Sequence, residues 1–259
     1  MNEQNFLTTK INNVGMQEVL DAVSERIGKR DPGYIVELNV DVVLKTDKDP
    51  ELKRACNEAM LSLADGKPLI WISKIFKEPL KEKISGSDLV PALCQRAANE
   101  NHKIFMLGGE NSALKQAISN LEDRCPGINI AGSYSPPFGF EKDEKELEKM
   151  DELIRSCSPD LLFVFFGCPK QEKWVMDHYK KAGAIVTVCA GGTVDFLSGN
   201  IKRAPKWMSN HGLEWFFRFL MEPKRLFKRY FIDDPAIVFL VYRYWKRRKN
   251  VTRNFMYHD

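Results

Sequence analysis

Short apolar runs alternate along the chain with longer segments whose apolar residues recur at the spacing of one helix face. Short runs are typical of buried strands, and recurrence every three or four residues is typical of amphipathic helices. The strand-like runs are 34–36, 69–75, 104–107, 128–131, 161–166 and 185–189, and the helical segments are 16–27, 50–63, 87–99, 111–121, 147–157 and 170–182. The alternation predicts a Rossmann-like α/β fold, with a largely parallel sheet and helices on both faces.

Glycine-rich and polar residues follow several of the predicted strands. After 161–166 the chain continues Gly-Cys-Pro-Lys-Gln (167–171), and after 185–189 it continues Ala-Gly-Gly-Thr (190–193). In open parallel sheets, ligands bind at such strand-to-helix junctions, where helix N-termini also favour phosphate. We therefore expect the positions after four strands to converge on one cleft: Asn39, Gly108, Gly167 and Gly191.

The composition is that of an ordinary globular protein, because 44% of the 259 residues are hydrophobic. The six cysteines are scattered without a CxxC pair or a Cys/His ligand spacing, which indicates reduced thiols in a cytosolic protein. The N-terminus has neither the basic nor the apolar region of a signal peptide. No window approaches the roughly 20 apolar residues of a membrane span. The sequence therefore predicts a cytoplasmic protein.

The charge is unevenly distributed. Residues 202–249 carry 13 Lys and Arg against four Asp and Glu, a net charge of +9, whereas the rest of the chain nets −5 of a formal total of +4. The same basic segment is rich in Trp, Phe and Tyr. Around 223–231 the apolar and basic residues also fall on opposite sides of a predicted helix, as in helices that lie on membranes. We expect an α/β core over 1–199 and a C-terminal appendage over 200–259 that binds an anionic membrane surface peripherally. Packing of the apolar side on the core is the alternative.

Short motifs spread over residues 30–230 carry a family resemblance. They are Asn-Val-Asp (39–41), Ala-Asp-Gly (64–66), Gly-Ser-Asp-Leu (86–89), Leu-Gly-Gly (107–109), Pro-Lys-Gln-Glu (169–172), Gly-Gly-x-x-Asp-Phe (191–196), Arg-Ala-Pro-x-Trp (203–207), Gly-Leu-Glu-Trp (212–215) and Glu-Pro-x-Arg (222–225). Each tripeptide is weak alone, but the ordered set closely resembles the WecG/TagA/CpsF family of bacterial glycosyltransferases.

The resemblance implies an inverting, metal-independent enzyme without a cofactor. Its donor would be a UDP-sugar and its acceptor a polyprenyl-diphosphate-linked sugar, in the biosynthesis of a cell-surface polysaccharide or teichoic acid. N-acetylmannosamine is the best-known transferred sugar of the family, but glucose, galactose and uronic acids remain open. The polymer pathway and a homo-oligomeric state also remain open.

The resemblance assigns catalysis to Asp65, Asn39 and Gln171. An inverting transfer needs a base that removes the acceptor hydroxyl proton, and the family's catalytic aspartate matches Asp65. Asn39 would bind sugar or acceptor, and the Gln171 amide suits a hydroxyl or a phosphate because it both donates and accepts hydrogen bonds. The alternative for Asp65 and Asn39 is a turn without chemistry.

Further residues are expected to bind the substrates. Glycines permit close backbone approach to the nucleotide, arginines bind two oxygens of a diphosphate at once, and an aromatic loop would shape the donor pocket. The predicted set is Lys83, Gly108, Gly109, Phe138, Gly167, Gly191, Gly192, Asp195, Arg218, Arg225 and Lys228. The alternatives are a helix cap for Asp195 and solvated surface cations for Arg218, Arg225 and Lys228.

Two positions depart from the family pattern. Many relatives have Thr two residues before the Asn of the first motif, where this chain has Glu37, and many have Arg where this chain has Lys83. Lysine is a point charge without the bidentate fork of arginine, so its contact to a phosphate is less directed. Glu37 leaves the role of that position open or signals a different sugar.

Two other classes of function are weaker. A nucleotide-cofactor oxidoreductase would need a GxGxxG turn, and the segment 107–111 lacks the third glycine. A non-enzymatic nucleic-acid-binding protein is suggested by the basic aromatic segment alone, and it would have no need of Asp65 or Gln171. We therefore expect no nucleic-acid partner.

Overall fold

A computed structural model describes residues 2–255. Within these residues, six strands form an all-parallel sheet in the order β4-β3-β8-β7-β5-β6. The strands are β3 (Gly33–Leu38), β4 (Leu61–Ala64), β5 (Lys103–Gly108), β6 (Asn129–Tyr134), β7 (Leu161–Phe165) and β8 (Val186–Cys189). The predicted α/β fold with a parallel sheet is confirmed.

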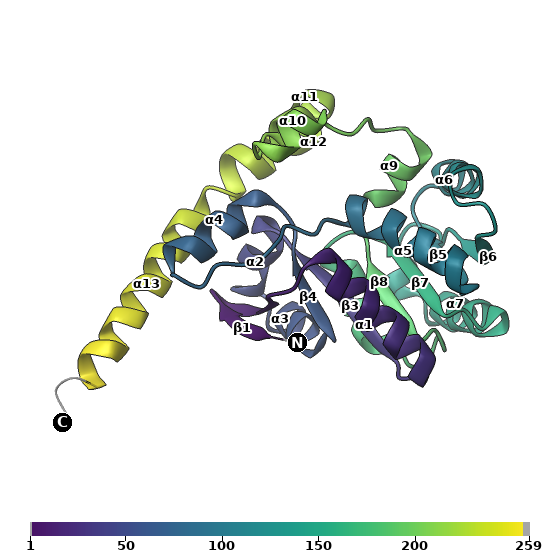
Figure 1. Cartoon of the computed structure of the whole chain (residues 1–259), viewed down its shortest axis with the longest axis horizontal. Helices are drawn as coiled ribbons and strands as arrows, with labels where there is room; N and C mark the ends of the chain where they lie inside the picture. The colour runs from purple at the N-terminus through teal and green to yellow at the C-terminus, as the bar shows by residue number, and fades with distance from the viewer. Residues whose placement is uncertain (1, 256–259) are drawn as a thin grey trace.

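Helices connect the strands and cover both faces of the sheet (Figure 1). They are α1 (Met16–Lys29), α2 (Val40–Thr46), α3 (Pro50–Glu58), α4 (Lys67–Ile75), α5 (Gly86–Glu100), α6 (Asn111–Arg124), the 3-10 helix η1 (Phe140–Lys142), α7 (Glu144–Cys157), α8 (Lys170–His178) and α9 (Thr193–Ser198).

Alternate side chains of each strand enter two separate hydrophobic cores. In β3, Ile35 packs on the face covered by α1, α5, α6 and α9, whereas Val36 and Leu38 pack on the face of α2, α3, α4, α7 and α8. Strands covered on both faces are continuous in apolar character, which is why the sequence shows them as unbroken runs. The two cores fix the sheet rigidly beneath the residues that follow its strands.

Two predicted elements are wrong. The segment 69–75 lies in helix α4, which begins after Gly66, the residue in the N-cap position with φ of 101°. The predicted helix 50–63 is really α3, which ends at Glu58, followed by β4. Asp65 therefore follows a strand and not a helix, which places it at the carboxyl edge of the sheet.

A short antiparallel hairpin precedes the first helix. It consists of β1 (Glu3–Phe6) and β2 (Thr9–Asn12), and no pattern in the sequence predicts it. Asn12 accepts a hydrogen bond from the backbone of Ser62 at 2.7 Å, which ties the hairpin to edge strand β4. The edge of the sheet is thereby covered.

The basic aromatic segment forms a series of helices on one side of the body. They are α10 (Lys206–Asn210), α11 (Glu214–Met221), α12 (Pro223–Lys228), the π-helix η2 (Arg229–Asp233) and α13 (Ala236–Phe255). Figure 1 shows the connection from α9 crossing to α10, and α13 running outward from the body. Near its start α13 packs on the body through the buried Leu240.

The predicted two-sided helix over 223–231 is not built as expected. Leu226 is buried, but Phe227 and Phe231, predicted to share its side, are half exposed and contact each other and Phe219. Arg229, predicted on the opposite side, turns inward to the sheet. The π-helical turn over Arg229–Asp233 changes the angle between residues, which breaks the 100° periodicity on which the prediction rested.

Candidate active site

One cleft lies at the carboxyl ends of β4, β3, β8 and β7, with a volume of about 420 Å³. This volume is in the range of small-molecule sites. Nine of the predicted site residues line it: Asn39, Asp65, Lys83, Gly167, Gln171, Gly191, Gly192, Arg218 and Arg225. A second hollow of about 670 Å³ between α2 and α13 is lined by none of the predicted residues.

Asp65 lies at the end of β4 with its backbone N–H bonded to Leu38 of β3 at 2.7 Å. Burial raises the pKa of its carboxyl, while the charges of Lys83 and Arg218 and a hydrogen bond from Asn39 lower it. Burial dominates, so the pKa lies above that of an ordinary aspartate. A carboxylate with a raised pKa is a stronger base, as general-base catalysis requires.

Asn39 caps the N-terminus of α2. Its Oδ1 accepts a hydrogen bond from the backbone N–H of Val42 at 3.1 Å and another from Nη2 of Arg229 at 3.2 Å. The cap, which the sequence analysis did not predict, keeps the side chain at the end of β3. The same atom thus joins the sheet to the C-terminal appendage.

Gln171 lies in the first turn of α8 and is buried. Its Oε1 accepts a hydrogen bond from the backbone N–H of Gly191 at 2.9 Å, and its Nε2 donates to Oε1 of Glu172, also at 2.9 Å. The amide therefore joins the loops after β7 and β8. One N–H and one lone pair remain for a substrate, so Gln171 both supports the cleft and can contact what it holds.

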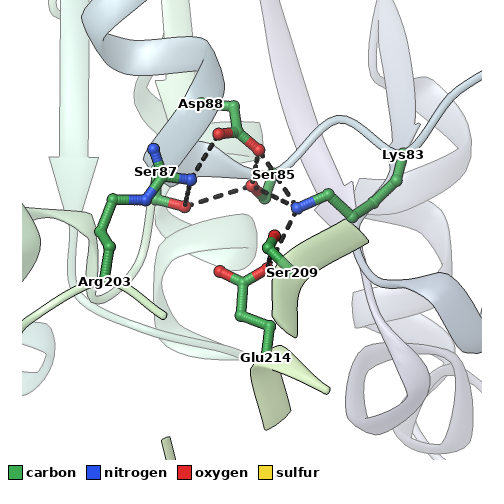
Figure 2. A network of polar contacts seen from close by, with 7 residues as sticks. All are labelled: Lys83, Ser85, Ser87, Asp88, Arg203, Ser209 and Glu214. Carbon is green, nitrogen blue, oxygen red and sulfur yellow. Dashed lines mark hydrogen bonds and ion pairs between the residues drawn. The ribbon is translucent and has the colours of Figure 1, made fainter. Parts of the chain in front are cut away.

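Lys83 is held by two carboxylates and does not point freely into the cleft (Figure 2). Its Nζ lies 3.1 Å from Oδ2 of Asp88 and 3.2 Å from Oε2 of Glu214, and its side chain is only 12% exposed. Burial alone would lower the pKa of Lys83, but Glu214 and Asp88 raise it above its ordinary value.

Figure 2 also shows how this network spans the chain. Asp88 accepts a hydrogen bond from Ser85 at 2.6 Å and pairs with Arg203, while Glu214 accepts from Ser209 at 3.1 Å. Burial opposes ionisation of Asp88, yet Ser85, Arg203 and Lys83 together lower its pKa to about 2. The network fastens residues 203–214 to the start of α5.

Three arginines from the appendage line the opposite wall of the cleft: Arg218, Arg225 and Arg229. The guanidinium of Arg218 lies over the Phe196 ring at 5.2 Å, and its buried Nε has no hydrogen-bond partner within the described part of the chain. Arg225 pairs with Glu222. Guanidinium groups in such an arrangement suit a diphosphate.

Five predicted site residues do not line the cleft. Gly108 and Gly109 follow β5, one strand beyond, so only three of the four expected strand ends converge. Both glycines have positive φ, and a Cβ would lie 2.7 Å from the Phe166 ring at Gly108 and 2.8 Å from Val194 at Gly109. Backbone conformation and close packing therefore explain both glycines without a contact to a substrate. Phe138, Asp195 and Lys228 also lie outside the lining.

The surroundings of these last three residues differ. Phe138 is fully exposed, with Nζ of Lys170 5.5 Å from its ring centroid. Asp195 lies in α9 beside the cleft, where burial raises its pKa and Arg225 lowers it. Lys228 is exposed on α12. Roles for them in binding stay predictions.

The cleft also contains residues that the sequence did not identify as candidates: Glu172, Trp215, Arg229, Tyr230 and Asp234. Glu172 was inside a quoted motif, and burial raises its pKa. Arg229 and Asp234 come from the π-helical turn and the residue after it, where the sequence shows only one more basic and one more acidic residue. Only the folded structure distinguishes them from other charged residues of this segment, because it places both in the lining of the cleft and Arg229 against Asn39.

Glu37, noted only as a departure from the family pattern, also lines the cleft. In residues 2–255, no three His, Cys, Asp or Glu side chains are arranged to hold a metal ion. In the same range, no helix is long and apolar enough to cross a membrane.

Comparison with known proteins identifies the family of the chain. The model of the glycosyl transferase WecG/TagA/CpsF family matches residues 4–251. The chain belongs to this family. It is therefore a glycosyltransferase, and its cleft, lined by a partly buried aspartate and by arginines, is the candidate site of glycosyl transfer.

Three similar relatives carry the same name, N-acetylglucosaminyldiphosphoundecaprenol N-acetyl-beta-D-mannosaminyltransferase. The protein of Bacillus subtilis strain 168 is 30% identical over 218 residues, which cover 84% of this chain and 81% of the relative. That of Bacillus spizizenii is 32% identical over 192 residues, covering 74% and 72%. That of Staphylococcus aureus strain MW2 is 32% identical over 194 residues, covering 74% of each.

Proposed function

We propose that this glycosyltransferase moves N-acetylmannosamine from a UDP-sugar to a polyprenyl-diphosphate-linked N-acetylglucosamine, with inversion and without a metal. The polymer would be a teichoic acid or another cell-surface polysaccharide. The observation that carries the proposal is that one cleft is lined by a partly buried carboxylate, Asp65, and by Arg218, Arg225 and Arg229. The names of the three relatives support this choice of sugar and acceptor.

In this mechanism Asp65 removes the proton from the acceptor hydroxyl as its oxygen attacks the anomeric carbon of the donor. A new carbon–oxygen bond forms on one face of the sugar, and the bond to the diphosphate breaks on the other. UDP departs with the electron pair. The proton stays on Asp65, whose raised pKa favours its acceptance.

The arginines stabilise the charge that develops on the leaving diphosphate. Preorganised cations in a cleft shielded from water are effective because they need no reorganisation during the reaction. The unpartnered Nε of Arg218 and the inward position of Arg229 suit this role. Lys83, already paired with Asp88 and Glu214, would act mainly on Asp65 and on the position of the appendage.

The nucleotide would lie along the loops after β7 and β8. Gly167 and Gly191 line the cleft there with positive φ, and Gln171 braces one loop against the other. Backbone N–H groups in such loops can approach phosphate oxygens closely. Asn39 and the free N–H of Gln171 would bind sugar hydroxyls.

The appendage would bring the enzyme to its lipid-linked acceptor. A polyprenyl chain does not leave the bilayer readily, because each exposed CH₂ costs about 0.8 kcal/mol. Exposed aromatic side chains on this segment include Trp207, Phe227, Phe231, Phe239 and Trp245. Basic residues of the segment would each contribute about 1 kcal/mol of attraction to an anionic leaflet, which gives reversible binding that salt weakens.

The test is transfer with purified protein, a panel of UDP-sugars and a short-chain prenyl-diphosphate N-acetylglucosamine. We expect turnover with UDP-N-acetylmannosamine, little effect of EDTA, and a loss of about 10²-fold or more in Asp65→Asn with UDP affinity retained. If only a different UDP-sugar were turned over, the proposed donor would be wrong, but the proposed glycosyl transfer would stand. Complete inhibition by EDTA that metal reverses would refute the metal-free mechanism.

A further inference from the structure

Glu37 places a carboxyl group where the fold has hydrophobic core. It lies in β3 two residues after Ile35, and because side chains alternate along a strand, both point to the face covered by α5 and α9. Its neighbour across the ladder is Leu63 of β4. Ile35 and Leu63 are fully buried apolar residues, so a carboxyl at this position has a cost that an apolar side chain would avoid.

The carboxyl lies between the first turns of two helices. A Cβ added to Gly86, the first residue of α5, would be 2.7 Å from Oε2 of Glu37 and 2.5 Å from Oγ1 of Thr193, the first residue of α9. Gly86 therefore leaves the space that the carboxyl fills. Thr193 directly follows Gly191 and Gly192, which line the cleft on the side proposed for the donor.

One oxygen of this carboxyl is unsatisfied. Glu37 is 9% exposed and lines the cleft, and its Oε1 has no hydrogen-bond partner among the side chains and backbone of residues 2–255. An unpaired buried polar atom costs about 1–3 kcal/mol. Because Glu37 lines the cleft, a bound substrate can supply the missing partner.

We infer that Glu37 hydrogen-bonds a hydroxyl of the transferred sugar and selects a neutral sugar over a uronic acid. This inference rests on the proposed function and names the class of donor within it. Glu37 would position the transferred sugar and contribute to donor specificity, while Asp65 remains the proposed base.

The surrounding charges explain the selection. Glu37, Asp65 and Glu172 all line the cleft, and burial followed by the charge of Asp65 raises the pKa of Glu37 well above its usual range. Glu172 and Asp88 act in the same direction, while the backbone N–H of Gly86 opposes them. The carboxyl of Glu37 can hydrogen-bond a hydroxyl of a neutral sugar. The carboxylate of a uronic acid would instead meet Glu37, Asp65 and Glu172, three acidic groups that disfavour a further negative charge beside them.

The experiment compares donors that differ only at C6: UDP-N-acetylmannosamine with UDP-N-acetylmannosaminuronic acid, and UDP-glucose with UDP-glucuronic acid. For the full-length protein we expect kcat/KM to favour the neutral member of the pair by about 100-fold or more. Glu37→Gln, which keeps the size and a hydrogen-bonding group, should lower neutral-donor kcat/KM by less than Glu37→Ala does. It should reduce the preference by about tenfold, because one acidic group is removed.

Glu37→Ala should lower kcat/KM for the neutral donor by at least tenfold, with UDP affinity unchanged in titration calorimetry. Asp151→Asn is the matched control, since Asp151 is a buried carboxyl on α7 outside the cleft, and it should leave the preference unchanged. If Glu37→Ala does not fold, Glu37→Gln alone decides through the donor preference.

Equal or better use of the uronic donor by the wild type would overturn the inference and leave the proposed function standing. An unchanged preference in Glu37→Gln would also overturn it. Failure of the wild type to turn over any UDP-sugar would instead refute the proposed function, and this inference with it.

Discussion

Replacement of Glu214 by glutamine should loosen the appendage from the sheet. Glu214 lies at the start of α11, and its Oε2 is 3.2 Å from Nζ of Lys83, which precedes α5. Glutamine keeps the size and can still accept the hydrogen bond from Ser209. The change therefore removes the ion pair while it preserves the neutral contacts around it.

The magnitude follows from distance and exposure. At 3.2 Å and an effective dielectric constant of about 20, the Coulomb attraction is about 5 kcal/mol before the cost of desolvation. Loss of one partner of a fully buried pair costs about 3–5 kcal/mol. Lys83 keeps Asp88 at 3.1 Å, and the Glu214 side chain is 22% exposed. We therefore expect about 1–2 kcal/mol, or roughly a tenfold increase in the open population.

Hydrogen exchange measures this opening directly. Amides of α11 and α12 should lose about tenfold in protection, while those of β5 and β7 should not change. Transfer should fall as well, because Arg218 and Arg225 move with these helices. Glu25→Gln is the control, since the Glu25–Lys29 pair on α1 is exposed, and exposed pairs contribute little. Unchanged protection in α11 and α12 would refute the reasoning, whatever happens to activity.

Three further outcomes are expected. In wild-type enzyme the acid limb of kcat/KM should lie at a higher pH than the pKa of an ordinary aspartate, because burial raises the pKa of Asp65. This limb should vanish in Asp65→Asn, and an unshifted limb in the variant would assign it to another group. Burial raises the pKa of Asp234 to about 6, so the native state binds the extra proton and stability falls as pH rises from about 4 to 6. Over this window Asp234→Asn should gain about 1–2 kcal/mol relative to wild type in urea unfolding, after allowance for solvent screening, and a constant difference would contradict this. The double substitution Phe227→Ser and Phe231→Ser should weaken co-sedimentation with anionic vesicles and should slow transfer to a long-chain acceptor. Transfer to a short-chain acceptor should not change. Equal loss of transfer with both acceptors would argue against a docking role.

The sheet could be predicted because most of its strands are apolar on both faces. The failures have local causes. In β4 only four residues, Leu61–Ala64, form the strand, and Leu63 continues the helical spacing of α3. In α4 the apolar run includes Trp71 and Ile75, which are at least half exposed, so continuous apolar character did not mean burial in a sheet. The Trp71 ring lies against Gly212, a contact that no local pattern reveals.

The site was predictable where a residue follows a strand directly. Asn39 is of this kind, because it follows β3 and was expected at a strand end. Asp65 also follows a strand, β4, but the sequence placed it after a helix, and Gln171 lies further on, in the first turn of α8. Arg229 reaches Asn39 from 190 residues away, and only the folded appendage brings the two together. Glu37 lies within a strand, where the sequence shows a lone polar residue without indicating that its carboxyl borders the cleft.

The uneven charge of the sequence acquires a physical meaning in the cleft. The acidic groups Glu37, Asp65 and Glu172 of its lining come from the body, whereas all the arginines in its described lining come from residues 218–229. The proposed base and the proposed leaving-group cations therefore meet only when the appendage lies on the sheet. A chain with the appendage displaced would keep Asp65 but lose Arg218, Arg225 and Arg229. Truncation at residue 200 would remove catalysis and membrane docking together, and only substitutions such as those at Glu214, Phe227 and Phe231 can separate the two.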